Sequence, residues 1–144
     1  MSDLSLSDLS KKMAKLDFAM LNTLSLEGGL SARPMSNNGD VEYDGDSYFF
    51  AYADSRKVTE IRTDAKVGLS YTGAVGMLGG PPLFVEIEGL AQLIDDKASF
   101  AEHWTKDLDR YFPDGIDTPN IVMIKVHAER IRYWDGGDEG TVTL

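Results

Sequence analysis

The chain has 144 residues, of which 42% are hydrophobic and 26% are charged, as expected for one ordinary globular domain with its own core. Its formal net charge of −10 argues against DNA, RNA or an anionic membrane as a partner. There is no cysteine, which excludes disulfides, thiolate metal sites and a cysteine nucleophile. No signal-peptide pattern or long apolar segment is present, so we expect a cytoplasmic location.

The predicted elements are mainly short strands joined by turns. An amphipathic helix is predicted over residues 4–16, with Ser5 or Ser7 able to cap it, and a second helix over 95–108. A short helix is predicted over 58–63. Turn signals lie at 27–29, 37–40 and 73–82. Alternating or apolar runs predict strands over residues 18–24, 30–35, 47–53, 66–72, 83–94, 121–126 and 130–134.

This pattern of about six strands at short spacing predicts a mainly β protein, a small antiparallel barrel with flanking helices. Consecutive strands joined by short turns argue against a doubly wound parallel sheet and its nucleotide site.

The junction between an aromatic strand and a short helix is the most informative part of the sequence. Ser55 is a good N-cap, but Arg56 and Lys57 follow it in the first helical turn. Cations there oppose the helix dipole, whereas an anion bound at the same corner would be stabilised by both the dipole and the cations. Two interpretations stay open at this point: a phosphate site, or two side chains that simply point into water.

Few other residues predict chemistry. Glu86 and Glu88 are expected on a solvated strand face, and His103 and His127 lack the spacing of a catalytic triad or metal site, so surface or structural roles are expected for both. Trp104, Tyr111 and Phe112 are expected to pack. Trp134 ends the last predicted strand, where it serves either as a lid on the barrel or as a contact for an interface or flat ligand.

Several segments together resemble the split-barrel flavin-binding superfamily of pyridoxamine 5′-phosphate oxidase, and specifically its general stress protein branch. The resemblance spans roughly residues 18–137 and implies a six-stranded antiparallel split β-barrel that binds FMN, as a single domain over residues 1–144. The segments that carry it are Ala32-Arg33-Pro34-Met35, the run from Phe49 to Val58, Val85-Glu86-Ile87-Glu88-Gly89, Tyr111-Phe112-Pro113 and Tyr133-Trp134-Asp135.

The resemblance also implies which residues bind the cofactor. Positions matching Ser55, Arg56 and Lys57 hold the FMN phosphate in that family. Those matching Arg33, Pro34 and Met35 lie along the ribityl chain and the flavin edge, and those matching Phe50 and Ala51 contact the cofactor. The tryptophan matching Trp134 reaches the flavin from the other subunit of a homodimer.

The sequence departs from the vitamin oxidases at its end. Those enzymes follow Trp-x-Gly-Gly with an Arg-x-His-x-Arg tail, whereas residues 138–144 here contain no arginine or histidine, and Phe84 replaces a glutamine that touches FMN. This argues against oxidation of pyridoxamine 5′-phosphate. The expected function is that of an FMN-dependent stress flavoprotein with oxidoreductase capacity. The alternatives are a flavin carrier or sensor, a dimeric interaction protein with a vestigial pocket, and FAD, a deazaflavin or haem as the cofactor.

Overall fold

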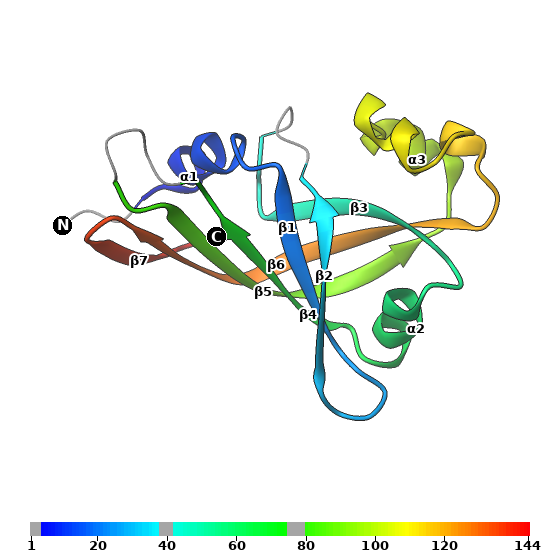
Figure 1. Cartoon of the computed structure of the whole chain (residues 1–144), viewed down its shortest axis with the longest axis horizontal. Helices are drawn as coiled ribbons and strands as arrows, with labels where there is room; N and C mark the ends of the chain where they lie inside the picture. Colours follow the sequence, from blue (N-terminus) through cyan, green and yellow to red (C-terminus); the bar gives the residue numbers. More distant parts are fainter. Residues whose placement is uncertain (1–3, 38–41, 75–79) are drawn as a thin grey trace.

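The computed structural model describes residues 4–37, 42–74 and 80–144, and within them a seven-stranded antiparallel sheet with three α-helices (Figure 1). The strands are β1 (Phe18–Leu24), β2 (Leu30–Ser36), β3 (Asp46–Tyr52), β4 (Lys66–Thr72), β5 (Leu83–Ile94), β6 (Ile121–Asp135) and β7 (Asp138–Val142). The helices are α1 (Leu6–Met13), α2 (Arg56–Thr63) and α3 (Lys97–His103). Short 3₁₀ helices cover Lys106–Arg110 and Gly115–Asp117.

The sheet confirms the predicted mainly β split-barrel class. The strands follow the order β2-β1-β4-β5-β6-β3, and β7 pairs with β6 outside this path. β6 is antiparallel to β5 along its length, while its other edge pairs with β3 in its first half and with β7 in its second half. Across the described residues no ladder joins β2 to β3, so the sheet is curled but not closed by hydrogen bonds.

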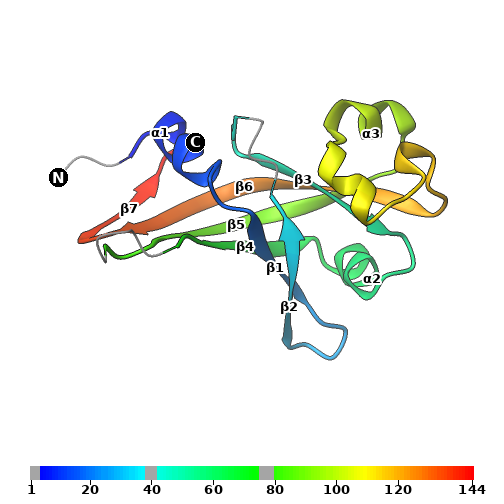
Figure 2. The same cartoon turned by 45° about the horizontal axis from the view of Figure 1, so that its top comes forward.

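The core lies between the inward faces of the strands and two of the helices. Leu21, Leu69, Ile87 and Ile131 are fully buried there, which follows from the apolar alternation of their strands. α1 is capped by Ser5, whose Oγ accepts a hydrogen bond from the Asp8 N–H at 3.1 Å. α1 and α3 lie toward opposite ends of the sheet, and the tip of the β1–β2 hairpin projects beyond it (Figure 2).

β6 corrects the prediction of two separate C-terminal strands. It runs without a break, but its register with β5 shifts between Glu88 and Gly89. Glu88 pairs with Arg130 and Gly89 with Ala128, so Glu129 is the extra residue of a β-bulge. The bulge reverses which side chains face inward, and this reversal breaks the sequence alternation that would mark one strand.

Helix boundaries and the C-terminal residues also differ from the predictions: α1 covers only Leu6–Met13 of the predicted 4–16, and α2 begins at Arg56 instead of residue 58. The helix expected over 95–108 ends at His103, because Trp104 is extended (φ −73°, ψ 138°), and the chain continues as a 3₁₀ turn. Residues 138–142, for which no strand is predicted, form β7 after a turn in which Gly136 has φ +66°.

Parts of two predicted turns, at 38–40 and 75–79, lie outside the described residues. Among the described helices none has the length and apolar character needed to span a membrane.

Candidate functional site

A groove of about 770 Å³ runs between the edge strands β2 and β3 and the segment that follows α3. Its volume is within the range of small-molecule and cofactor sites. The strands contribute Pro34, Met35 and Ser36 on one side and the run from Tyr48 to Tyr52 on the other. The far wall is built by His103, Thr105, Asp107, Leu108, Arg110, Tyr111 and Phe112.

Aromatic packing fixes this wall against the sheet. The Phe50 ring makes edge contacts with Trp104 at 4.8 Å and with Phe100 at 5.7 Å between ring centroids. Trp104 also meets Phe112 at 5.7 Å, which fits the packing role predicted for both residues. Tyr111, in contrast, is 48% exposed and lines the groove.

One end of the groove is the corner where β3 turns into α2, and both Ser55 and Lys57 line it. Ser55 occupies the N-cap position, but its hydroxyl donates to the Tyr52 carbonyl at 2.7 Å and does not cap the helix. The prediction that the Ser55 side chain caps α2 is therefore wrong. The N–H groups in the first turn of α2 have no side-chain cap from Ser55.

Lys57 is half-buried at this corner, and its pKa is lowered by desolvation and, secondarily, by the positive charge of Arg33. A bound anion would offset both effects. The corner therefore combines an uncapped helix start with a partly desolvated ammonium, the arrangement suited to an anionic ligand.

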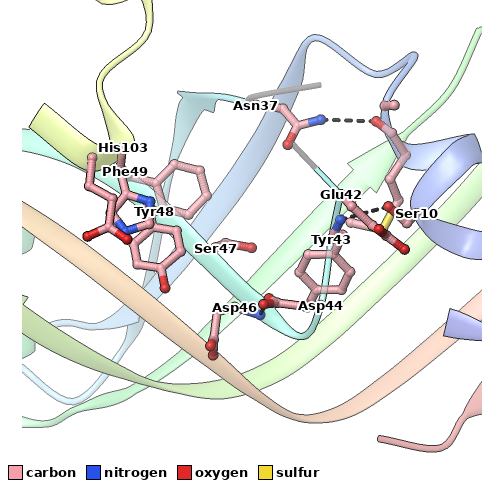
Figure 3. A pocket seen from close by; sticks show the side chains of 13 residues that line it. Ser10, Asn37, Glu42, Tyr43, Asp44, Asp46, Ser47, Tyr48, Phe49 and His103 are labelled. Atoms are coloured by element: carbon pink, nitrogen blue, oxygen red, sulfur yellow. Dashed lines mark hydrogen bonds between the residues drawn. The ribbon is translucent and has the colours of Figure 1, made fainter. Parts of the chain in front are cut away.

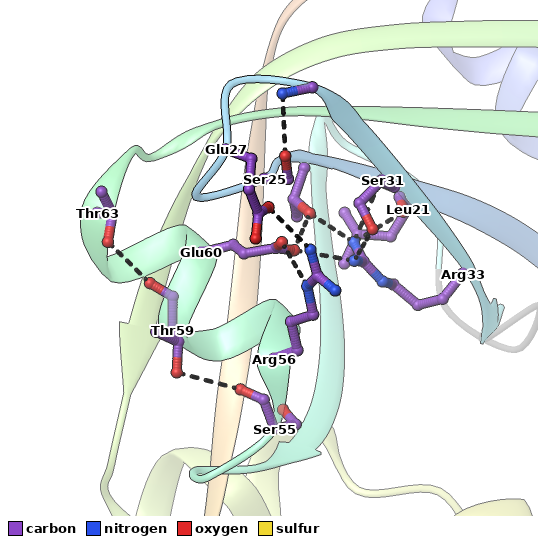
Figure 4. A network of polar contacts seen from close by, with 12 residues as sticks. Leu21, Ser25, Glu27, Ser31, Arg33, Ser55, Arg56, Thr59, Glu60 and Thr63 are labelled. Carbon is purple, nitrogen blue, oxygen red and sulfur yellow. Dashed lines mark hydrogen bonds and ion pairs between the residues drawn. The ribbon is translucent and has the colours of Figure 1, made fainter.

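The other two expected cations of the site are held by a buried carboxylate (Figure 4). Glu60 is fully buried, and its Oε1 accepts hydrogen bonds from Thr23 Oγ1 at 2.7 Å and Arg33 Nη2 at 3.0 Å. Its Oε2 accepts from Arg56 Nε at 3.0 Å. Arg56 Nη2 also reaches Glu27 at 3.2 Å, at the tip of the β1–β2 hairpin.

These contacts hold Glu60 ionised. Its pKa is lowered chiefly by the hydrogen bond from Thr23 and further by Arg56 and Arg33. Sequence reasoning missed both Glu60 and Thr23. The i,i+4 spacing of Arg56 and Glu60 on α2 could have indicated the pair, whereas nothing in the sequence around Thr23 marks its role.

Six of the nine residues expected at a cofactor line the groove: Pro34, Met35, Phe50, Ala51, Ser55 and Lys57. Arg33 and Arg56 are beside it in the Glu60 network and do not line it. Trp134 is near the far end of β6, half-buried, paired with Phe84 of β5 and Glu139 of β7, with the Arg132 guanidinium 5.3 Å from its ring.

A smaller hollow of about 260 Å³ adjoins the groove (Figure 3). The Tyr48 and His103 rings stack at 3.6 Å with an interplanar angle of 14° and line both spaces. His103 was expected to have a surface or structural role, and the structure places it in the wall of the groove. His127 lies elsewhere, exposed and 2.7 Å from Asp46. No cluster of metal ligands occurs in the part of the chain that the structure describes.

Comparison with known proteins identifies the family of this chain. The sequence model described as "Pyridoxamine 5'-phosphate oxidase like" matches residues 5–144. The chain belongs to this family.

One curated protein is similar to part of this chain in sequence, and two solved structures share its fold. General stress protein 26 of Bacillus subtilis is 33% identical over 61 residues, which are 42% of this chain and 43% of the length of that curated relative. A crystal structure of a protein related to general stress protein 26, from Clostridium acetobutylicum, superposes with a TM-score of 0.77 at 20% identity, covering 96% of this chain and 94% of that one. A heme binding protein from Mycobacterium smegmatis superposes with a TM-score of 0.77 at 15% identity, covering 99% of this chain and 59% of that one.

Proposed function

We propose that the groove binds FMN and that the protein is a flavin-dependent oxidoreductase of the general stress protein type. The observation that carries this proposal is the position of Lys57, half-buried at the uncapped start of α2, at one end of a groove with aromatic walls. The family shared with pyridoxamine 5′-phosphate oxidase and general stress protein 26 supports a flavin-type cofactor.

The residues of the groove fit such a ligand in chemistry and in size. Lys57 and the first-turn N–H groups of α2 would hold the phosphate, while Met35 and Phe50 supply buried apolar surface for the flat ring system. When bound, FMN supplies hydride and one-electron chemistry, and the protein supplies position, electrostatics and the exclusion of water. No acid or base in the groove is assigned a catalytic step.

The decisive experiment compares two ligands that differ only in the phosphate. Titration of the purified protein should give a lower Kd for FMN than for riboflavin, because only FMN carries the group that Lys57 would meet. Equal Kd values would remove the phosphate corner from the proposal. Steady-state oxidation of NADH or NADPH by the flavin-loaded protein then separates an oxidoreductase from a carrier or sensor.

We further propose a homodimer in which Trp134 completes the partner's flavin site. Within one chain Trp134 does not line the groove, and it lies near the end of β6 opposite to Ile121, which pairs with the groove residue Tyr52. Phe84, which pairs with Trp134, is 42% exposed, so this end of the sheet presents apolar surface to a second subunit. Sedimentation of the purified protein as a monomer would contradict this part of the proposal.

A second candidate ligand is haem, favoured by one observation. His103 lines the groove with its ring supported by Tyr48, and an imidazole is a common axial ligand of haem iron. A haem binding protein is among the proteins of the same fold. A Soret band after haem titration that is lost in His103→Ala would support this candidate, and its absence would leave the flavin.

A further inference from the structure

The Glu60 network carries an inference about how the groove selects its ligand, and the inference rests on the proposed function. Glu60 is a fully buried carboxylate on the helix that forms the corner, one turn beyond Lys57. It joins three elements, since Thr23 comes from β1, Arg33 from β2 and Arg56 from α2 (Figure 4). A buried charge of this kind is retained only where its partners compensate it.

The direction of the two guanidinium groups decides which cation faces the groove. Arg33 uses Nη1 on Thr23 Oγ1 at 2.7 Å and Nη2 on Ser31 Oγ at 2.9 Å and on Glu60. Arg56 uses Nε on Glu60 and Nη2 on Glu27. The guanidinium groups of both arginines are hydrogen-bonded to protein oxygens beside the groove. Lys57, in contrast, lines the groove and makes no ion pair with any described residue.

We propose that Glu60 is a positioning residue that directs the two guanidinium groups away from the groove and leaves Lys57 as the cation that meets a phosphate. The carboxylate also sets the charge of the corner. The three cations are opposed by Glu60 and Glu27, which leaves one net positive charge. A net positive charge at the corner suits one phosphate monoester. This net charge is smaller than the three positive charges that Arg33, Arg56 and Lys57 would give without the two glutamates.

Arg56 has two possible roles at the corner, and a single substitution would not distinguish them. If Arg56 touches the phosphate, its loss removes a contact that no change at Glu60 can restore. If Arg56 only compensates Glu60, its loss exposes a negative charge one helical turn from the phosphate site, and removing that charge restores binding.

The test is a double-mutant cycle of Arg56→Ala and Glu60→Gln, read as the ratio of the riboflavin Kd to the FMN Kd. Arg56→Ala should lower the ratio roughly tenfold, the effect of one uncompensated charge near the phosphate. Glu60→Gln should raise the ratio several-fold. The double variant, whose corner again has one net positive charge, should return to within about twofold of the wild-type ratio.

Arg62→Ala is the matched control, because it removes one positive charge from the same helix at a residue that does not line the groove. It should leave the ratio unchanged. Thermal unfolding confirms that each variant is folded, and Arg56→Gln replaces Arg56→Ala if the latter is not. The ratio is insensitive to a general loss of packing, which weakens both ligands alike.

Three results would overturn the role of Glu60: an unchanged ratio in Arg56→Ala, a loss in Arg56→Ala that Glu60→Gln does not restore, or a fall of the ratio in Glu60→Gln alone. The proposed function fails by a different result, namely a wild-type protein that does not distinguish FMN from riboflavin.

Discussion

Replacing Gly89 by alanine tests how strictly the bulge between β5 and β6 depends on a missing side chain. A Cβ at this position would lie 2.5 Å from the carbonyl oxygen of His127 and 3.2 Å from Val126 Cγ1. The closer atom belongs to the backbone of the paired strand at the register shift, so it cannot turn aside as a flexible side chain would. The two strands must therefore separate locally or the bulge must rearrange.

The expected cost follows from opposing effects. Alanine restricts the unfolded chain and so favours the fold by ~0.4–1 kcal/mol where the native backbone accepts it. Overpacking against a fixed backbone costs ~1–3 kcal/mol. We expect a net loss of ~1–2 kcal/mol in the free energy of unfolding, which corresponds to a fall in Tm of about 3–8 °C for a domain of this size.

Urea unfolding followed by circular dichroism measures this difference, with Gly68→Ala as the control. A Cβ at Gly68 would meet the Ile87 carbonyl oxygen at 3.6 Å and Asn22 Cβ at 3.8 Å, which are ordinary contacts. Gly68→Ala should be neutral or slightly stabilising. Equal free energies of unfolding for the two variants would refute the argument that the close approach at the bulge is what requires glycine.

Four other expectations are open to direct measurement. Lys57→Ala should weaken FMN binding roughly ten- to a hundredfold, the value of one charge-assisted contact, and leave riboflavin binding unchanged by titration. Since the fold lowers the pKa of Glu60, its contribution to stability is present above the unfolded-state pKa of ~4.3 and is lost as the pH falls through the lower folded-state value. Glu60→Gln should accordingly lose stability near neutral pH, and its difference from wild type should narrow in acid unfolding series. Bound FMN should fluoresce less than free FMN and recover emission in Trp134→Ala; equal emission would place the indole away from the flavin. The loaded protein should not turn over pyridoxamine 5′-phosphate, and sustained formation of the aldehyde would show that a basic C-terminal tail is dispensable.

The strands that sequence located without error are those whose alternation is uninterrupted. β1, β4 and β5 begin and end at the predicted residues, because apolar and polar positions alternate between clear turn signals. The prediction divided β6 into two strands because a bulge at Glu129 shifts the apolar alternation by one residue. β7 has few apolar residues, and only its pairing with β6 makes it a strand.

The candidate site was predictable where its residues are neighbours in sequence. The Ser55–Lys57 corner and the run at Arg33–Met35 could be recognised as segments, and the structure brings both to one region. What could not be predicted is which of two adjacent cations faces the groove. Arg56 pairs with Glu60 on its own helix, as their i,i+4 spacing could have indicated, but the groove that Lys57 lines is built by strands far away in sequence.

The wall of the groove opposite Lys57 has its own small hydrophobic core. Phe50, Phe100, Phe112, Ile121 and Met123 form a cluster separate from the main core of the barrel. Detaching α3 and the turns after it would expose this cluster alone, at a fraction of the free energy of global unfolding. Amide protons of α3 should therefore exchange with solvent sooner than those of β4 and β5, and the strands of the barrel would stay paired while this wall opens.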